Sequence, residues 1–395
     1  MKKIKSKVSI SFIIIITSLF ILKCSTPDPN ENNDKNFLSN SKIEEAVKLS
    51  GSNSNQIVSA LQKCEPGYKE GLNFLIENMP ERDLKKLSSE YILTNVEYAY
   101  KVMDSVKWKD EIPKEIFLNY ILPYSNINER RDNWRKDFYN RFFSMVKNYN
   151  TVSEAVLKLN KEIWDLVNVH YSTKRPKADQ SPYESIDAGI ASCTGLSILL
   201  IDVCRAVGIP ARFVGVPLWK DQSGNHSWVE IWDNGWHFIG AAEESPLDKT
   251  WFGERALTSD DTDWKYSIYA ASFKKTDVIF PPLFDSTATY IYADIVTDRY
   301  SKTVSEDGKV TLAIRLFDRP NGKRITGNIK IQLKNKTVFE GTTKDELHDF
   351  NDFLTFNLLP NTQYKIIAQI NGESIEKQIT LDGSKYQFVN LSFNN

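Results

Sequence analysis

Residues 192–210 read SCTGLSILLIDVCRAVGIP, a segment in which apolar side chains recur at the spacing of an α-helix. Gly208 and Pro210 are typical of the end of such a helix. Cys193 therefore falls in the first turn, where backbone N–H groups without helical partners and the positive end of the helix dipole favour a thiolate. The same N–H groups could hold an oxyanion. We expect a helix that presents one thiol at its amino end, with these residues on its apolar face: Leu196, Leu199, Leu200, Val203, Cys204 and Val207.

A β-hairpin is predicted shortly after this helix. Residues 226–232 and 236–242 read as two strands, and Asn234-Gly235 between them is a strong signal for a two-residue turn. In that register His226 pairs with Glu243, with Cβ atoms roughly 5 Å apart, which suits a carboxylate–imidazole hydrogen bond. A three-residue loop would shift the pairing by one residue and weaken this inference.

These three side chains form a candidate catalytic group. Cys193 would be the nucleophile, His226 the base that takes its proton, and Glu243 the group that orients the base. The competing interpretation is that Cys193 is a small buried apolar residue and His226 a hydrogen-bonded core histidine. Trp228 and Trp232 share a face with His226 and would either shape a substrate cleft or pack in the core.

The same residues carry a resemblance to a known family. The segment from Ser192 to Arg212, with its Gly-Ile-Pro-Ala-Arg end, and the strand beginning Asn225-His226-Ser227-Trp228 resemble the core of the transglutaminase-like superfamily. The similarity covers roughly residues 183–252, and the wider chain is similar to secreted Bacteroidota lipoproteins that contain such a domain. It implies a papain-like α+β core with a Cys-His-Asp triad, in which Cys193 is the nucleophile and His226 the general base.

The third member of the triad departs from the family pattern. The position where the family usually has an aspartate is Gly240 in this sequence, which has no side chain to offer. Glu243 is the nearest carboxylate at a plausible strand end. The sequence therefore leaves two possibilities: Glu243 replaces the aspartate, or the site is weakened.

The amino-terminal residues predict export. Four lysines within the first seven residues precede an apolar stretch, Val8–Leu22, and Cys24 follows. This resembles a lipoprotein signal peptide over residues 1–24 in which Cys24 receives the lipid, although Lys23 fits poorly and an uncleaved anchor is the alternative. Residues 25–40 are polar and contain proline, which is typical of a flexible tether. We expect a lipid-anchored protein of the cell envelope that faces the periplasm or the surface.

Composition excludes several classes of protein. The formal net charge is −1 with no basic stripe, so nucleic acid is not an expected partner. Besides Cys24 only three cysteines are present, too few for a disulfide framework. Cys193 and Cys204 would lie about 16 Å apart along one helix, too far to share a metal ion. The sequence predicts neither a cofactor nor a metal.

The chain divides by its patterns into three folded parts. Residues 41–150 read as a helical region, residues 151–286 as the transglutaminase-like core, and residues 287–395 as an antiparallel β-sandwich of the immunoglobulin-like or carboxypeptidase-regulatory-like kind. The predicted fold class is α+β. The sandwich would be either a spacer or a binding module. Its six expected strands are 310–317, 329–333, 353–359, 364–370, 374–381 and 388–393.

Together these features predict an exported thiol enzyme. Cys193 would attack a peptide or carboxamide carbonyl, and water or an amine would resolve the thioester, with hydrolysis preferred. A protein, a peptide or the peptide part of peptidoglycan is the expected substrate. The alternative is a non-catalytic binding or scaffold protein with a degenerate core, which Gly240 favours. A papain-type protease of standard spacing is disfavoured because His226 follows Cys193 too closely.

Overall fold

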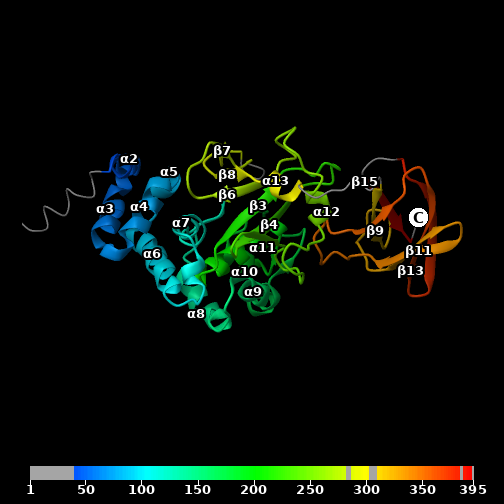
Figure 1. The fold of residues 1–395 in the computed structure, drawn as a ribbon, viewed down its shortest axis with the longest axis horizontal. Coiled ribbons are helices and arrows are strands. Elements are labelled where there is room, and N and C mark those ends of the chain that lie inside the picture. The colour runs from blue at the N-terminus through cyan, green and yellow to red at the C-terminus, as the bar shows by residue number, and fades with distance from the viewer. Residues whose placement is uncertain (1–39, 282–285, 302–308, 383–385, 394–395) are drawn as a thin grey trace, which may run out of the picture.

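The structure is a computed structural model that describes residues 40–281, 286–301, 309–382 and 386–393. Three parts follow one another along the long axis of the molecule: helices at one end, a mixed centre, and strands at the other end (Figure 1). This arrangement confirms the predicted α+β class with a helical amino-terminal region. The predicted signal peptide, Cys24 and all but the last residue of the predicted tether lie outside the described residues.

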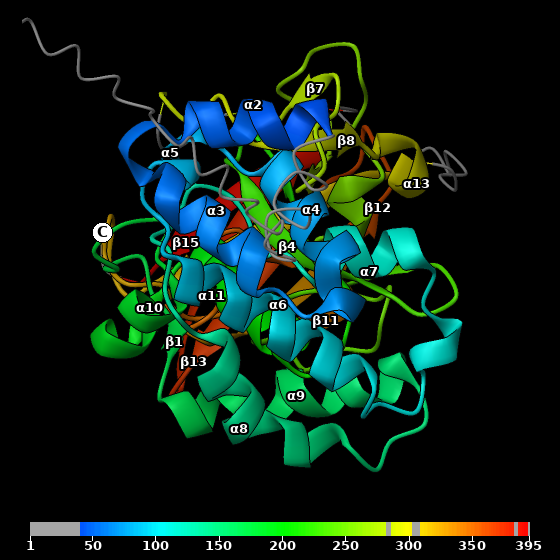
Figure 2. The same ribbon diagram turned by 90° about the vertical axis from the view of Figure 1, so that its left-hand side faces the viewer.

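The helical region is a bundle of short helices with its own apolar core. Figure 2 shows these helices stacked in front of the rest of the molecule. Ile57, Leu72 and Ile92 lie on three different helices and are fully buried in that core. The helices are α2 (Ser41–Leu49), α3 (Ser54–Lys63), α4 (Lys69–Asn78), α5 (Glu81–Leu84), α6 (Ser89–Met103) and α7 (Lys114–Tyr120), with 3-10 turns at Gly51–Asn53, Pro66–Tyr68 and Lys109–Glu111.

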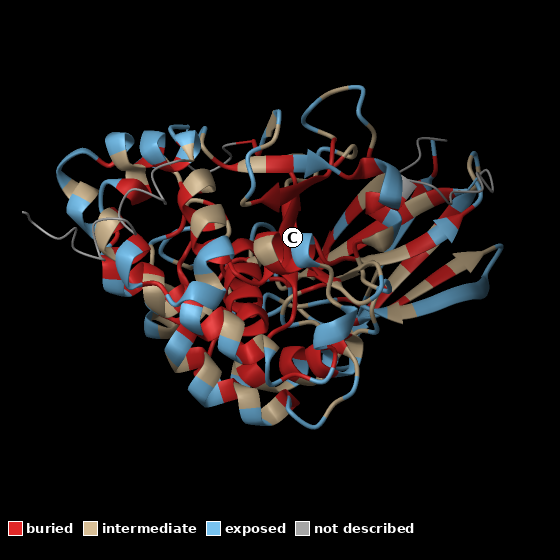
Figure 3. Ribbon diagram, turned by 60° about the vertical axis from the view of Figure 1, so that its left-hand side comes forward, coloured by how far each residue is buried: buried red, intermediate tan, exposed pale blue. Residues whose placement is uncertain are grey.

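A single buried helix, α11 (Cys193–Ala206), forms the centre of the molecule. Nearly every side chain beyond its first residue is buried, as the red ribbon in Figure 3 shows. Helices α8 (Arg135–Val146) and α9 (Val152–Val167) pack on it from one side and the central sheet from the other, in one continuous apolar core. Thr151 caps α9 by accepting a hydrogen bond from the backbone N–H of Glu154 at 3.2 Å.

The central sheet has six strands, all antiparallel, in the order β5-β4-β3-β6-β8-β7. Its last strand in sequence, β8, lies beyond residue 286, so the sheet extends past the boundary predicted for the core. The strands are β3 (Ala211–Val216), β4 (His226–Trp232), β5 (Trp236–Ile239), β6 (Tyr269–Ser272), β7 (Val278–Ile279) and β8 (Tyr292–Ile295). The remaining short elements of this part are β1 (His170–Tyr171), α10 (Pro182–Ala188), β2 (Ile190–Ala191), α12 (Gly253–Ala256) and α13 (Thr297–Ser301).

The register of the β4–β5 hairpin differs from the predicted one. Trp232 pairs with Trp236, so the loop has three residues rather than two. Asn234 adopts a left-handed conformation with φ of 56° in that loop. The hairpin forms as predicted, but every pair is shifted by one, and β5 ends at Ile239. The predicted strand pairing of His226 with Glu243 is therefore wrong.

The carboxy-terminal part is a β-sandwich, as predicted. A four-stranded sheet, β11-β10-β13-β14, faces a three-stranded sheet, β12-β9-β15, across a shared apolar core. The pair β9–β15 is parallel, whereas the other pairs are antiparallel. The exposed edge strand β11 was not predicted. The strands are β9 (Val310–Phe317), β10 (Asn328–Leu333), β11 (Lys336–Thr342), β12 (Leu354–Leu358), β13 (Gln363–Ile370), β14 (Glu373–Thr380) and β15 (Tyr386–Ser392).

Across the described ranges, no helix combines the length and the apolar character needed to cross a bilayer.

Candidate active site

Cys193 is the first residue of α11 and is partly accessible. The helix begins there because the side chain of Ser192 caps it, accepting from the N–H of Gly195 at 3.3 Å. Burial and the neighbouring Asp349 raise the pKa of the Cys193 thiol, while hydrogen bonds from the backbone N–H groups of Ser227 and Thr194 lower it. The two N–H groups therefore lie next to the sulfur, beside the place that the carbonyl oxygen of a bound substrate would occupy.

His226 begins β4 and is enclosed by aromatic rings. Its ring centroid lies 4.7 Å from that of Trp251 and 4.8 Å from that of Phe252. Burial, with a smaller contribution from the positive charge of Arg255, lowers the pKa of His226 to about 3. Among the described residues, neither ring nitrogen has a hydrogen-bond partner. His226 is thus a neutral imidazole with both nitrogens available to accept or donate a proton.

A third reactive side chain, Asp349, joins this pair from the sandwich. It lies in the loop between β11 and β12, and its Oδ2 is 3.7 Å from Nδ1 of His226. The sulfur of Cys193, a ring nitrogen of His226 and a carboxylate oxygen of Asp349 all lie within 4.8 Å of one another. Burial raises the pKa of Asp349 to about 6.

Glu243, the carboxylate predicted from sequence, lies in the same pocket but has another partner. Its Oε1 accepts a hydrogen bond from Nε1 of Trp251 at 2.7 Å. Burial raises the pKa of Glu243 to about 8. The structure contains no hydrogen bond between this carboxylate and His226, because both imidazole nitrogens are unpaired. Glu243 instead reaches the imidazole indirectly, through the Trp251 ring that packs against it.

The Glu243 carboxyl group also folds back over Gly240. A Cβ atom built on Gly240 would collide with that carboxyl group. Glu243 therefore places its carboxylate in the space into which a side chain at position 240 would project. The lack of a side chain at Gly240 and the presence of Glu243 are two parts of one local arrangement.

Trp228 and Trp232 are placed away from the pocket. Trp228 is fully buried behind His226, and its Nε1 donates to the hydroxyl of Tyr300 at 2.8 Å. Trp232 packs edge-on against Trp236, with ring centroids 5.4 Å apart. Neither indole lines the cavity beside Cys193.

The cavity beside Cys193 has a volume of about 330 Å³. Carboxylates from three parts of the chain line it, and among the described lining residues there is no lysine or arginine. Such a lining favours a cationic or neutral ligand over an anionic one. Its ionisable lining residues are Asp165, His170, Tyr171, Cys193, His226, Glu243, His348, Asp349 and Asp352.

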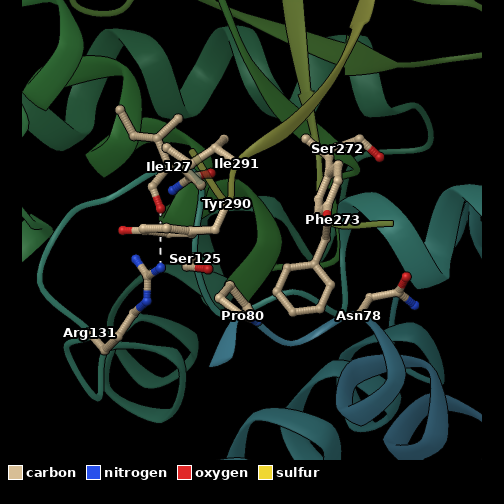
Figure 4. Close-up of a pocket in the computed structure, with 11 residues that line it drawn as sticks. Asn78, Pro80, Ser125, Ile127, Arg131, Ser272, Phe273, Tyr290 and Ile291 are labelled. Atoms are coloured by element: carbon tan, nitrogen blue, oxygen red, sulfur yellow. Dashed lines mark hydrogen bonds between the residues drawn. The ribbon is translucent and has the colours of Figure 1, made fainter. Parts of the chain in front are cut away.

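A second, smaller cavity lies between the helical region and the sheet (Figure 4). Its volume is about 20 Å³ and no cysteine or histidine lines it. Arg131 is one of the residues that line this cavity. Its guanidinium donates to the carbonyl of Ile127 at 3.1 Å and to Asp83 at 2.9 Å. Because its charged group is already paired, this cavity is a packing space rather than a reactive site.

Comparison with known proteins supports the class that this core and site define. Residues 142–241 match the model of the transglutaminase-like superfamily, which confirms the resemblance predicted from the sequence. The matched segment contains Cys193, His226 and Gly240, whereas Glu243 and Asp349 lie beyond it. The chain therefore contains a transglutaminase-like core with carboxylates supplied from outside that segment.

Two solved structures are similar to parts of this chain. A proposed cysteine protease from Cytophaga hutchinsonii is 20% identical with a TM-score of 0.25, over 41% of this chain and 58% of its own. Red sea bream transglutaminase is 9% identical with a TM-score of 0.32, over 70% of this chain and 65% of its own. The match thus spans less than two thirds of either protein. No curated protein matches the chain.

Proposed function

We propose that this protein is an exported thiol enzyme that cleaves peptide or carboxamide bonds through a thioester on Cys193. The observation that supports it best is the position of the sulfur, at the amino end of α11 and within 4.8 Å of an imidazole nitrogen of His226. The thiol enzyme class agrees with the transglutaminase-like match. Hydrolysis, export and the substrate are the proposed part.

The reaction would proceed in two balanced steps. In the first, the thiol proton passes to His226 while the sulfur forms a bond to the carbonyl carbon. The N–H groups of Thr194 and Ser227 hold the resulting oxyanion, and the imidazolium returns the proton to the leaving amine as the C–N bond breaks. In the second, His226 takes a proton from water, the hydroxide attacks the thioester, and the thiol regains its proton as the acid leaves.

We propose that water is the acceptor of the acyl group. Cys193 is partly accessible, so water can reach the thioester. An amine would instead give a cross-link, and nothing in the pocket lining excludes it. We propose a protein, a peptide or a peptidoglycan peptide as substrate, met in the cell envelope through the lipid predicted on Cys24. Loss of membrane association in a Cys24→Ala variant would test the anchoring separately from the chemistry.

A non-catalytic binding role is the second candidate, and the state of the site favours it. Burial holds the pKa of the Cys193 thiol above its usual range, and lowers the pKa of the imidazole to about 3. A site in that state contains neither a thiolate nor an imidazolium at neutral pH. The core would then keep its shape while the acidic cavity recognises a ligand without reacting.

Thiol labelling separates the two candidates. Native protein is treated with iodoacetamide near neutral pH, and each cysteine is followed by mass spectrometry. An enzyme should label at Cys193 at least tenfold faster than a free cysteine peptide, and His226→Asn should remove that excess. The buried Cys64 and Cys204 serve as internal controls, and Cys193→Ala as the blank. Labelling no faster than the peptide, or unaffected by His226→Asn, would contradict the enzyme.

A further inference from the structure

The loop that contains Asp349 is held in a fixed conformation within the sandwich. It joins β11 to β12, and the buried side chain of Arg324 holds its backbone in place through hydrogen bonds. The guanidinium of Arg324 is only 6% exposed and donates to four carbonyls of the loop. A side chain that satisfies four carbonyls at once fixes the backbone of the loop. The accepting carbonyls belong to Asp345 (2.7 Å), His348 (2.6 Å), Phe350 (3.2 Å) and Asp352 (3.3 Å).

The same loop is also fixed to the core by the two residues that follow Asp349. The N–H of Phe350 donates to the hydroxyl of Tyr171 at 2.9 Å. The side-chain amide of Asn351 donates to the carbonyl of Asn225, the residue before His226, at 2.9 Å. The N–H of Asn351 also donates to Oδ1 of Asp349 at 2.8 Å, so these contacts leave the carboxylate little freedom. The position of Asp349 beside the thiol and the imidazole is therefore specified by the fold.

We infer that Asp349 is a catalytic carboxylate of the Cys193–His226 site, and that the sandwich is a part of the active site rather than a spacer. Resting on the function proposed above, this inference assigns the appended domain a direct role. Oδ2 of Asp349 lies 3.7 Å from Nδ1 of the base, and both groups lie within 4.8 Å of the Cys193 sulfur. Within the part of the chain that the structure describes, this buried oxygen has no hydrogen-bond partner.

The chemical need for such a carboxylate follows from the surroundings of His226. When the base takes the thiol proton, an imidazolium forms among aromatic rings and near the positive charge of Arg255. Burying that charge without a partner would be costly. An ionised carboxylate 3.7 Å away compensates it. Glu243 does not occupy this place, because its carboxylate is bonded to Trp251.

A pair of substrates with one acyl group and two leaving groups tests the inference. A nitrophenyl ester needs no proton on its leaving group, whereas a peptide amide needs one from the imidazolium. Asp349→Asn should therefore lower kcat/KM for the amide at least tenfold more than for the ester. Arg324→Met, which releases the loop, should change the ratio in the same direction. Asp345→Asn is the matched control, since it removes a charge from the same loop outside the cavity.

The outcomes decide the matter directly. Circular dichroism first shows that each variant is folded. If Asp349→Asn leaves both substrates unchanged or speeds them up, Asp349 does not stabilise the imidazolium and the inference fails. An equal loss for the two substrates would limit its role to the imidazolium that forms when the thiol is deprotonated. If Asp345→Asn shifts the ratio as much as Asp349→Asn, the effect is general to the loop charge and the inference also fails.

A second measurement needs no turnover, so it separates this inference from the proposed function. In a Cys193→Ala background no thiol competes for the carboxylate, and Nδ1 of His226 should become its donor. Nitrogen-15 NMR of the imidazole should then show the proton on Nδ1, and adding Asp349→Asn should shift the tautomer. If the wild-type thiol is unreactive but this tautomer shift is present, the proposed enzyme function is refuted and the Asp349–His226 pair is supported. An unchanged tautomer would refute the pair.

Discussion

The Asp349 carboxylate of the sandwich lies 3.7 Å from Nδ1 of His226 in the central sheet. This relationship joins two parts of the chain that the sequence presents as separate domains. The contacts of Phe350 with Tyr171 and of Asn351 with Asn225 hold the two parts together immediately after Asp349. A sandwich that were only a spacer would have no reason to place a buried carboxylate beside the thiol.

Gly240→Ala should destabilise the protein by displacing Glu243. The new Cβ atom would collide with the Glu243 carboxyl group, which would have to leave Nε1 of Trp251 without its acceptor. Losing a buried hydrogen bond of this kind costs about 1–3 kcal/mol. Urea denaturation of the variant and the parent measures the difference in free energy of unfolding.

A double-mutant cycle supplies the control for this prediction. In a Glu243→Ala background the collision is absent, so Gly240→Ala should cost less there by about 1 kcal/mol or more. The pair Gly240→Asp with Glu243→Ala returns the carboxylate to the position usual in the family, and should be more stable than Gly240→Asp alone. Additive costs in the cycle would mean that the two residues do not share the space.

Glu243 should make stability fall with rising pH. Its pKa is raised to about 8 in the folded protein, from an ordinary value of 4.5, so the folded state binds the proton more tightly than the unfolded state. Its contribution is fully present below pH 4.5 and is lost as the pH rises towards 8, at up to about 1.4 kcal/mol per pH unit.

Glu243→Gln tests this dependence because the amide does not titrate. Unfolding by urea at pH 5 and pH 7.5 should show a larger loss for the wild type than for Glu243→Gln. Glu244→Gln is the neighbouring control, since that side chain is 70% exposed and pairs with Lys161 at the surface. If the wild type and Glu243→Gln lose the same free energy between the two pH values, the buried carboxyl group does not set the slope.

The proposed nucleophile and base could be placed on their elements from sequence because the signals for those elements are local. Cys193 follows a capping serine at the start of an apolar helix, and His226 opens a strand just before an Asn-Gly turn. Each element is specified by residues within a few positions of it. The register between the two strands could not be predicted from such local signals. It depends on whether the loop contains two residues or three, and the prediction assumed two.

Asp349 could not be found in the same way. It lies in a loop of another domain, and its distance from the thiol depends on how the sandwich packs against the core. The periodicity of apolar residues in the sequence does not predict that packing. The burial of Arg324 under that loop could not be predicted either. Its four acceptors are backbone carbonyls, which any residue provides, so no side chain in the sequence identifies them. The missed strand β11 has a similar cause: it is an exposed edge strand without the alternation that buried strands show.

The acidic cavity should prefer substrates with a positive charge. Asp165, Asp349 and Asp352 line it without a lysine or arginine among the described residues. Peptides with lysine beside the reacting carbonyl should give a kcat/KM about tenfold above matched peptides with glutamate, since opposite charges at close range differ by about 1 kcal/mol or more. The preference should shrink at high salt and in Asp352→Asn. Equal rates for the two peptides would contradict the role of the lining.

Arg135 should be essential for joining the helical region to the core. Its fully buried guanidinium donates to the Asn95 side chain and to backbone carbonyls of both parts, including Arg205 in α11 at 3.2 Å and Ile121 at 2.9 Å. Arg135→Met keeps the apolar stem but leaves these buried acceptors unpaired, which should cost about 3–5 kcal/mol.

Lys136→Met is the control for Arg135→Met, because Lys136 lies next to it in α8 and is exposed. Thermal unfolding followed by circular dichroism should show a drop of several degrees for Arg135→Met and little change for Lys136→Met. A split of the single transition into two would show that the arginine couples the helical region to the core. A loss within about 0.5 kcal/mol would instead mean that water replaces the guanidinium and that the two parts are held together by their apolar contacts alone.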